Sequence, residues 1–562
     1  MVFVKYEDAI LAAYDHIGMK PRDNQLEVVN DILTKFLDDG YSNVIASLPT
    51  GTGKTPIALV VSYALREITK TNELAFISMH TNILMEQYKN TFEHVKDICF
   101  IKGAGNYNCD WLTLYSGQPQ NAECCTGDCP NSFMDDCVFR KIKEKAQNAK
   151  TIVSNFHYWM IKQEHGKREP YINIFDEAQN LNNSFVEHHS INVTDKTFDR
   201  FDFLYDADKK YFNRSYRTFT LELRNALKCV NEKNFLMYLM MLEKYLLKPI
   251  NFQHIIDDTE RLIKAARENK NLSKKELNKE VNDLTKTLRN ATYFNNLKEA
   301  VDRIDPSTSI FGLSENGFYL KPAIIGDYWQ TNMRPAKYNL FISATISQQY
   351  VESTIKLKGK TAFIKHKSAF PPENKKVIIY KPLNLNYKTM QDNETIKQLN
   401  ERCLEIVNMQ TKYKGIISTP TFTLTKTISE YLSLRGIDVF EHKSGEKLEN
   451  IIGDFKSYNK PSVLISPMLF EGIDLPDDLA RYQILTKCPY ASLQDNVVKY
   501  ILNHYPELYQ FQTLLKIIQF FGRGVRNKDD WSNIFVLDTN VVRLLSDRAN
   551  VWSDEYKLIK VQ

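Results

Sequence analysis

Short apolar runs alternate with amphipathic stretches along the first part of the chain. The apolar runs lie at 44–46, 74–78, 151–155, 171–175 and 338–342. Each is only a few residues long and is followed by polar or glycine-containing positions, as is typical of a buried strand. Between them, apolar residues recur every three or four positions, as in 21–36, where Pro21 starts a predicted helix with one apolar face. Strands that alternate with helices predict a parallel sheet covered by helices.

A second unit with the same alternation begins near Lys376. Its candidate strands are 377–379, 415–418, 463–465, 483–485 and 534–537, and Pro371-Pro372 marks the predicted linker before them. From about 192 to 305 the pattern is helical and polar, and we predict an inserted helical subdomain without strands. Its predicted core includes the stripe Phe235, Leu239, Leu242 and Leu246. The predicted fold class is therefore α/β, with two parallel-sheet units and a helical insertion.

Composition places few further limits on the protein. The 562 residues are too many for one core, so about three or four domains are expected. The net charge of +5 neither requires nor excludes a polyanionic partner. The start of the chain turns acidic at Glu7 and Asp8, so we predict no secretory signal, and the most apolar stretch, 235–247, is too short to span a bilayer. We therefore expect a reducing, intracellular location, either cytoplasmic or nucleoid-associated.

The segment 47–55, Ser-Leu-Pro-Thr-Gly-Thr-Gly-Lys-Thr, has the composition of a nucleotide phosphate loop. It lies between an apolar run and a helical pattern, which is the context that such a loop needs. Lys54 would reach the terminal phosphates of ATP, and the Thr55 hydroxyl would bind Mg²⁺. Leu48 replaces the first glycine of the usual pattern, so the prediction rests on Gly53-Lys54-Thr55 and its context. The remaining predicted phosphate contacts are Pro49, Thr50, Gly51, Thr52 and Gly53, and upstream Arg22 and Gln25 are candidates for contacts to the base.

Two acidic residues, Asp176 and Glu177, follow the apolar run 171–175. A carboxylate pair at the end of a buried strand is the expected partner of a phosphate loop. Asp176 would hold Mg²⁺, and Glu177 would polarise the attacking water. Together with Lys54, the pair predicts ATP hydrolysis.

The second unit has no phosphate loop, but it carries Gln519 and the pair Arg523 and Arg526. These arginines are three residues apart, so we expect them to share one helix face. Arginines that a second domain places over a nucleotide on the first stabilise charge on the transferring phosphoryl group. Two solvated arginines are the simpler alternative, and the neighbouring glycines argue against it.

Five of the nine cysteines lie between 109 and 137. In a reducing compartment, clustered cysteines bind metal more often than they form disulfides. Four thiolates can hold a [4Fe–4S] cluster or a structural zinc, and the spacing lacks the paired Cys-x₂-Cys knuckles of zinc ribbons. We therefore predict an iron–sulfur cluster held by Cys109, Cys125, Cys129 and Cys137, although Cys124 competes with Cys125 for one position.

In their order along the chain, these motifs resemble those of the superfamily 2 helicases of the iron–sulfur XPD/DinG family. The segment 47–55 matches the first motif, and 176–179 resembles the second, Asp-Glu-Ala-His, with Gln179 in place of histidine. Ser343-Ala344-Thr345 stands at the third motif, 471–474 fits the fifth, and 519–526 fits the sixth. The resemblance adds Gln179, Gly472 and Asp474 to the predicted nucleotide contacts. The four cysteines between the first and second motifs are the family's most distinctive mark.

The resemblance implies two RecA-like motor domains with an iron–sulfur insertion and a helical arch insertion. It divides the chain into motor domain 1 (1–100, 149–191 and 311–370), an iron–sulfur domain (101–148), the arch (192–310) and motor domain 2 (371–562). It implies an ATP-dependent DNA helicase that moves on single-stranded DNA, usually 5′ to 3′, and unwinds duplex. The implied cofactors are ATP, Mg²⁺ and a [4Fe–4S] cluster, and the implied partners are single-stranded DNA and duplex junctions.

Two other functions stay open on the sequence alone. The first is an ATP-driven nucleic-acid translocase or RNA remodeller that never separates strands. The second is a nucleotide-gated scaffold whose helical insertion docks a protein partner, which the pair Asp176 and Glu177 makes less favourable. Gln179 departs from the family's histidine and leaves the coupling of hydrolysis to the nucleic-acid site open.

Overall fold

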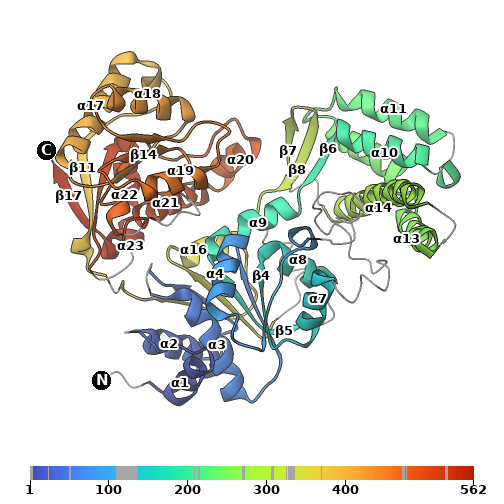
Figure 1. The fold of residues 1–562 in the computed structure, drawn as a ribbon, viewed down its shortest axis with the longest axis horizontal. Helices are drawn as coiled ribbons and strands as arrows, with labels where there is room; N and C mark the ends of the chain where they lie inside the picture. Colours follow the sequence, from blue (N-terminus) through green and yellow to red (C-terminus); the bar gives the residue numbers. More distant parts are fainter. Residues whose placement is uncertain are drawn as a thin grey trace.

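The computed structural model shows three bodies (Figure 1). We name them motor domain 1 (elements within 7–188 and 338–365), the arch (elements within 191–322) and motor domain 2 (elements within 375–561). It describes residues 4–561 except 23, 50–51, 109–136, 166–167, 208, 213–214, 269–272, 305–308, 325, 327–328, 330–335, 369, 471–474, 476 and 526–528. The chain passes once from motor domain 1 to motor domain 2. In Figure 1, motor domain 1 lies at the bottom, motor domain 2 at the upper left and the arch at the upper right.

Motor domain 1 is built on a seven-stranded parallel sheet with the order β10-β1-β9-β5-β2-β4-β3. Its strands are β1 (Asn43–Ser47), β2 (Leu74–Met79), β3 (Ile98–Phe100), β4 (Thr151–Asn155), β5 (Pro170–Asp176), β9 (Tyr338–Ser343) and β10 (Thr361–Lys365). The five predicted strands are confirmed, and the edge strands β3 and β10 are additional. β1, β2 and β5 are buried along their whole length, as expected for strands covered on both faces.

Helices cover both faces of this sheet. One face packs against α1 (Glu7–His16), α2 (Gln25–Leu37), α3 (Lys54–Thr69) and α4 (Asn82–Phe92). The other packs against α7 (Val138–Asn148), α8 (Phe156–His165), α9 (Leu181–His188) and α16 (Gln348–Thr354). The predicted start of the second helix at Pro21 is wrong, because Asn24 adopts the left-handed conformation (φ 69°) and α2 begins only at Gln25.

The arch has a helical core, but it also contains a sheet that the sequence did not predict. Its helices are α10 (Asp195–Ala207), α11 (Ser215–Leu227), α12 (Phe235–Leu242), α13 (Phe252–Glu268) and α14 (Lys274–Arg303). At its base, β6 (Ile191–Thr194), β7 (Ser309–Ser314) and β8 (Gly317–Pro322) form an antiparallel sheet with the order β6-β8-β7. Within the described part of the segment 192–305, where no strand was predicted, only the short and partly exposed β6 contradicts the prediction, whereas β7 and β8 follow that segment and continue past the predicted end of the arch at 310. The stripe Phe235, Leu239, Leu242 and Leu246 is buried in the arch core, as predicted.

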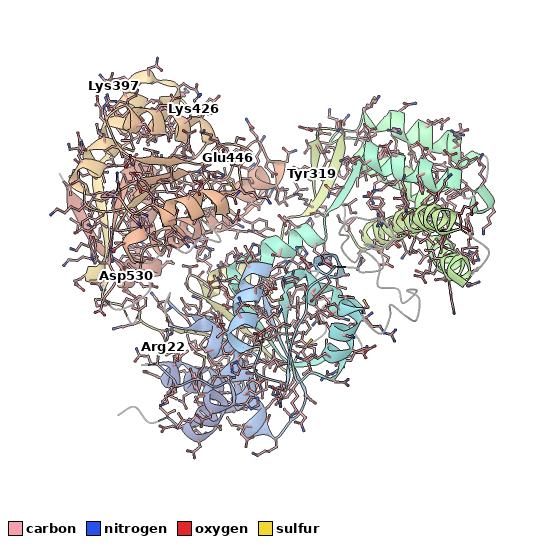
Figure 2. All side chains as sticks on the ribbon, viewed as in Figure 1. Arg22, Tyr319, Lys397, Lys426, Glu446 and Asp530 are labelled. Atoms are coloured by element: carbon pink, nitrogen blue, oxygen red, sulfur yellow. The ribbon has the colours of Figure 1, made fainter. Side chains whose placement is uncertain are left out.

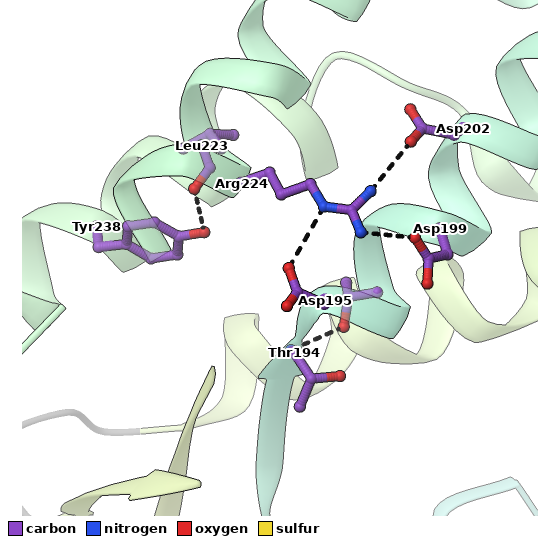
Figure 3. A network of polar contacts seen from close by, with 8 residues as sticks. Thr194, Asp195, Asp199, Asp202, Leu223, Arg224 and Tyr238 are labelled. Atoms are coloured by element: carbon purple, nitrogen blue, oxygen red, sulfur yellow. Dashed lines mark hydrogen bonds and ion pairs between the residues drawn. The ribbon is translucent and has the colours of Figure 1, made fainter. Parts of the chain in front are cut away.

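A polar network ties two of the arch helices together (Figure 3). The Arg224 guanidinium, on α11, contacts Asp195 at 3.3 Å, Asp199 at 2.7 Å and Asp202 at 3.4 Å. These aspartates follow one face of α10, so they would repel one another without a shared cation. The Tyr238 hydroxyl donates to the Leu223 carbonyl at 2.8 Å and joins α12 to the same helix. Arg224 therefore fixes how α10 and α11 pack.

Motor domain 2 repeats the architecture of motor domain 1. Its parallel sheet has the order β13-β14-β12-β15-β16-β11-β17. The strands are β11 (Lys375–Leu383), β12 (Gly415–Ser418), β13 (Val439–Glu441), β14 (Val463–Ser466), β15 (Tyr482–Leu485), β16 (Ser532–Asp538) and β17 (Lys557–Val561). Its helices are α17 (Asn393–Met409), α18 (Phe422–Ser433), α19 (Leu448–Ser457), α20 (Asn496–His504), α21 (Pro506–Phe521), α22 (Thr539–Asp547) and α23 (Ala549–Trp552). The predicted α/β fold class with two parallel sheets is confirmed.

Contacts at the linker and at the base of the arch are among those that join these bodies. The chain passes from β10 to β11 through 366–374, which includes the predicted linker Pro371-Pro372. Beside it, Lys365 Nζ pairs with Asp554 Oδ2 at 3.0 Å. The base of the arch reaches motor domain 2, where the Tyr319 hydroxyl (Figure 2) lies 3.3 Å from Asp495 Oδ1 at the start of α20. Within the part of the chain that the structure describes, no helix is both long and apolar enough to cross a membrane.

Candidate nucleotide site

The predicted phosphate loop connects β1 to α3 at the carboxyl edge of the first sheet. β1 ends at Ser47 and α3 begins at Lys54, so the loop leads directly into the N-terminus of a 16-residue helix. The neighbouring strands hold its start, because the Leu48 N–H donates to the Ser343 carbonyl at 2.8 Å and the His366 N–H donates to the Ser47 carbonyl at 3.2 Å. Thr50 and Gly51 lie outside the described residues. The strand–loop–helix context that the sequence predicts is present.

Gln25 braces this loop from behind. Its side-chain amide donates to the Thr52 carbonyl at 2.8 Å, and its Oε1 accepts from the Tyr14 hydroxyl at 3.0 Å and from the Arg22 N–H at 2.8 Å. Gln25 is buried, and both the oxygen and the nitrogen of its side-chain amide form hydrogen bonds within the protein. That Gln25 and Arg22 contact the base stays a prediction.

Gly53 is the position where a side chain would disturb this brace most. It has φ +79°, and a Cβ built on it would lie 2.3 Å from Gln25 Nε2. Gly53→Ala therefore combines left-handed strain of about 1 kcal/mol with displacement of Gln25, and we expect about tenfold weaker nucleotide binding. Equilibrium binding of a fluorescent ATP analogue measures this. Gly105→Ala is the control, because a Cβ there meets nothing within 4 Å. Unchanged affinity of Gly53→Ala would contradict the role given to the loop.

The predicted acidic pair lies beside Lys54. β5 ends at Asp176, and the Lys54 Nζ lies 3.9 Å from Glu177 Oε1. Glu177 has φ 54°, an uncommon conformation for a residue with a side chain, and the Gln179 amide holds its other oxygen at 2.6 Å. The structure therefore brings Lys54, Asp176, Glu177 and Gln179 together at the ends of two strands separated by β9.

Tyr88, on α4, is a member of the site that the sequence analysis missed. Its hydroxyl donates to Asp176 Oδ2 at 2.7 Å, and it also interacts with Thr55. Burial, followed by the charge of Asp176, raises the pKa of Tyr88 far above its ordinary value, so the phenol stays a hydrogen-bond donor. Tyr88 looks like any apolar position in the helical repeat of α4, so no motif distinguishes it. It links the two residues predicted to bind Mg²⁺.

Asp176 is buried, and its protonation should affect the stability of motor domain 1. Burial, together with the negative charge of Glu177, raises the pKa of Asp176 to about 6, although Lys54 and Tyr88 oppose the shift. The folded chain then binds this proton more tightly than the unfolded chain does, so stability falls as the pH rises from about 4 to 6. Asp176→Asn removes this pH dependence. The free energy of unfolding of Asp176→Asn minus that of the parent should therefore be about 2 kcal/mol larger at pH 7.5 than at pH 4.5.

Denaturant unfolding of metal-free Asp176→Asn and the parent chain at both pH values tests this prediction. Asp15→Asn, at an exposed position on α1, is the control for removing a carboxylate from the same domain. A difference between Asp176→Asn and the parent that does not change with pH would show that Asp176 is not held in its protonated form.

Arg523, the one described member of the predicted arginine pair, does not lie on a helix face as expected. α21 ends at Phe521, and Gly522 follows it as the C-cap, so Arg523 lies in a turn and not on the helix face. Its guanidinium donates to the Phe470 carbonyl, next to the segment of the fifth motif. Gln519 lies in the last turn of α21 and is half-buried. Arg526, Gly472 and Asp474 lie outside the described residues, so their roles stay predictions.

Of the predicted cluster ligands, only Cys137 is described. It is half-buried, carries a free thiol and immediately precedes α7, which packs on the first sheet. A thiolate at this place is compatible with a cluster ligand near motor domain 1. Cys109, Cys125 and Cys129 lie outside the described residues, as does the competing Cys124. Among the described residues, no group of three or more His, Cys, Asp or Glu side chains is placed to hold a metal ion.

Comparison with known proteins supports both motor domains separately. Residues 18–203 match the family model of the type III restriction enzyme res subunit, and residues 408–550 match that of the helicase C-terminal domain. A 92-residue segment is 32% identical to the ATP-dependent DNA helicase DinG of Photobacterium profundum. That segment is 15% of this chain and 13% of the relative, so the chain matches only a small part of DinG.

The fold resembles solved structures over nearly its whole length. An XPD helicase structure matches with a TM-score of 0.59 and 16% identity, covering 96% of this chain and 100% of the other. The structure of S. tokodaii Xpd4 matches with a TM-score of 0.54 and 14% identity, again over 96% and 100% of the chains. At these identities the likeness shows a shared fold. The ordered motifs, the two family models, the DinG segment and this fold agree, and both parallel-sheet domains of the chain are similar to those of superfamily 2 helicases such as XPD and DinG.

Proposed function

We propose that the protein is an ATP-dependent DNA helicase that moves 5′ to 3′ along single-stranded DNA and unwinds duplex. The observation that supports ATP hydrolysis in this proposal is the position of the Lys54 amine, 3.9 Å from Glu177 Oε1 and beside the buried Asp176; the DNA substrate and the direction rest on the resemblance to the helicases. A cation that would bind phosphate, a buried carboxylate and a second, half-buried carboxylate are the groups that ATP hydrolysis requires. A second RecA-like domain attached by one linker supports movement driven by this site.

In this proposal, each residue has one role. Lys54 binds the terminal phosphates, and Glu177, held by Gln179, orients the attacking water. Thr55 and Asp176 would hold Mg²⁺, which neutralises charge on the phosphates when bound. Arg523, from motor domain 2, would exchange its bond to the Phe470 carbonyl for a phosphate oxygen. Closure of the two domains on ATP and their release after hydrolysis would then move the strand.

ATP turnover with and without single-stranded DNA tests the proposal first. We expect stimulation of at least about tenfold by DNA. Strand displacement on duplexes with a 5′ or a 3′ single-stranded tail, made of DNA or RNA, then tests substrate and direction. Displacement only from the 5′ DNA tail supports the helicase. Stimulated turnover without displacement supports the translocase or RNA remodeller, and turnover that ignores nucleic acid contradicts both.

We also propose a [4Fe–4S] cluster held by Cys109, Cys125, Cys129 and Cys137. Four thiolates suit such a cluster, and we propose a structural role for it. Anaerobically purified protein should contain about four irons per chain and absorb visible light. Stoichiometric zinc without colour would overturn the assignment. Work on DNA would place the protein in the cytoplasm or on the nucleoid, and we propose that location.

A further inference from the structure

One side chain connects the second motif directly to motor domain 2. Tyr350 lies on α16, three residues after the Ser347 that caps this helix, and its hydroxyl donates to the Gln179 carbonyl at 2.6 Å. Tyr350 is buried, and burial raises the pKa of its phenol, so the hydroxyl remains a donor. The bond fixes the backbone of the turn that follows Asp176 and Glu177.

The other face of Tyr350 contacts α21 of motor domain 2. Its ring stacks on Phe511, with centroids 4.9 Å apart and an angle of 26° between the planes. The next residue, Gln512, donates to Asn183 on α9 at 3.3 Å. α21 therefore contacts motor domain 1 at both sides of the turn that carries the second motif.

α21 is shared between the cores of the two motor domains. Leu508, Phe511 and Leu515, in its first half, pack in the same apolar cluster as Tyr350. Ile517, Phe520 and Phe521, in its second half, pack in the core of motor domain 2. Arg548 binds Glu507 and Gln510, and so ties the start of α21 to the end of α22. α21 therefore spans the contact between the two motor domains, with its first half packed on motor domain 1 and its second half in the core of motor domain 2.

A pocket borders this contact. A pocket of about 250 Å³ lies between α16 and the segment 504–511, and its lining includes Tyr350, Tyr505 and Phe511. Close-packed side chains transmit a displacement from one element to the next, so the stacked rings couple α16 to α21. Phe511 and the end of α21 are ten residues apart, about 15 Å along a helix, and Arg523 follows two residues later.

We propose that Tyr350 is the positioning residue that transmits the state of the nucleotide site to α21, and through α21 to Arg523. Nucleotide bound at Lys54 moves the turn at 176–179, the Gln179 carbonyl moves Tyr350, and the stacked Phe511 moves α21. The same contacts run in reverse, so closure of motor domain 2 resets Glu177. This inference rests on the proposed ATP site, and it does not depend on whether the nucleic acid is DNA or RNA.

Tyr350→Phe and Phe511→Leu test the two halves of this connection. Tyr350→Phe keeps the stacked ring and removes only the bond to the Gln179 carbonyl, and Phe511→Leu keeps an apolar side chain but removes the ring. We expect each to lower stimulation of ATP turnover by single-stranded DNA about fivefold, with KM for ATP and basal turnover within twofold of the parent. The double variant should lose no more than the worse single variant, because both act in one connection. Tyr505→Phe, which removes a hydroxyl from the same pocket, should have no effect.

Hydrogen exchange separates a failure of this inference from a failure of the proposed function, because it needs neither hydrolysis nor nucleic acid. In the parent chain, AMP-PNP should change the protection of the amides of α21, and Tyr350→Phe should abolish the change while binding AMP-PNP with the same affinity. An unchanged response in Tyr350→Phe, an additive double variant, or no response of α21 in the parent would each overturn the inference. A different outcome would contradict the proposed helicase function but support the role of Tyr350: ATP turnover that nucleic acid does not stimulate, together with a response of α21 to AMP-PNP that requires Tyr350.

Discussion

Replacing Lys54 by alanine is expected to lower kcat for ATP hydrolysis by at least about 100-fold and to weaken ATP binding. Lys54 is the first residue of α3, its amine is mostly buried, and it lies 3.9 Å from Glu177. Removing a preorganised charge from a phosphate site costs about 3 to 4 kcal/mol of transition-state stabilisation, which corresponds to this loss of rate. Steady-state turnover with saturating Mg²⁺ measures it.

Lys89→Ala is the matched control for this experiment, because Lys89 is exposed on α4 of the same domain. Its kcat should stay within twofold of the parent. Near-normal turnover of Lys54→Ala would mean that the phosphates bind elsewhere, and the proposed ATP site would then be wrong.

The second large effect is expected for Glu177→Gln, which should lose about 100- to 10,000-fold in kcat but keep its affinity for ATP. The amide is nearly the same size as the carboxylate, so it should keep a hydrogen bond with Gln179. It cannot polarise water, so turnover stops after ATP binds. Loss of one negative charge beside Lys54 also leaves binding of the anionic nucleotide equal or tighter.

Binding of a fluorescent ATP analogue, measured alongside single-turnover hydrolysis, separates these two effects. Glu187→Gln, on the exposed side of α9, should change neither quantity. A Glu177→Gln variant that binds ATP poorly and hydrolyses what it binds at the parental rate would assign the catalytic role to another carboxylate.

The central strands and the nucleotide site were predictable because local chemistry determines them. The buried strands β1, β2 and β5 are recognisable as apolar runs, because their side chains are removed from water. The phosphate loop is recognisable by Gly53, because that position has a positive φ. Edge strands such as β10 leave no such mark, since half of their residues face solvent. The sheet at the base of the arch was missed for the same reason.

Other features depend on contacts between residues far apart in the chain. Tyr88 becomes part of the site only when α4 packs near the end of β5, 88 residues away, and Tyr350 reaches the turn after β5, 171 residues away, only through the packing of α16. Arg523 was placed on a helix because the spacing to Arg526 fits one, but Gly522 ends α21 first. Spacing alone therefore predicts which residues belong to a motif better than it predicts where a helix stops.

The pairing of β10 with β1 gives the phosphate loop a mechanical role. β10 is the last strand before the linker, and it runs parallel to β1, with Lys365 opposite Ser47 at the start of the loop. A force that pulls the motor domains apart through this linker acts along β10 and loads its hydrogen bonds to β1 together, in shear. Ser47, which leads directly into the phosphate loop, is one of the residues that bear this load. Force applied to the bound nucleic-acid strand would thus be transmitted to the phosphate loop. The affinity for ATP should therefore depend on the opposing force applied in an optical trap.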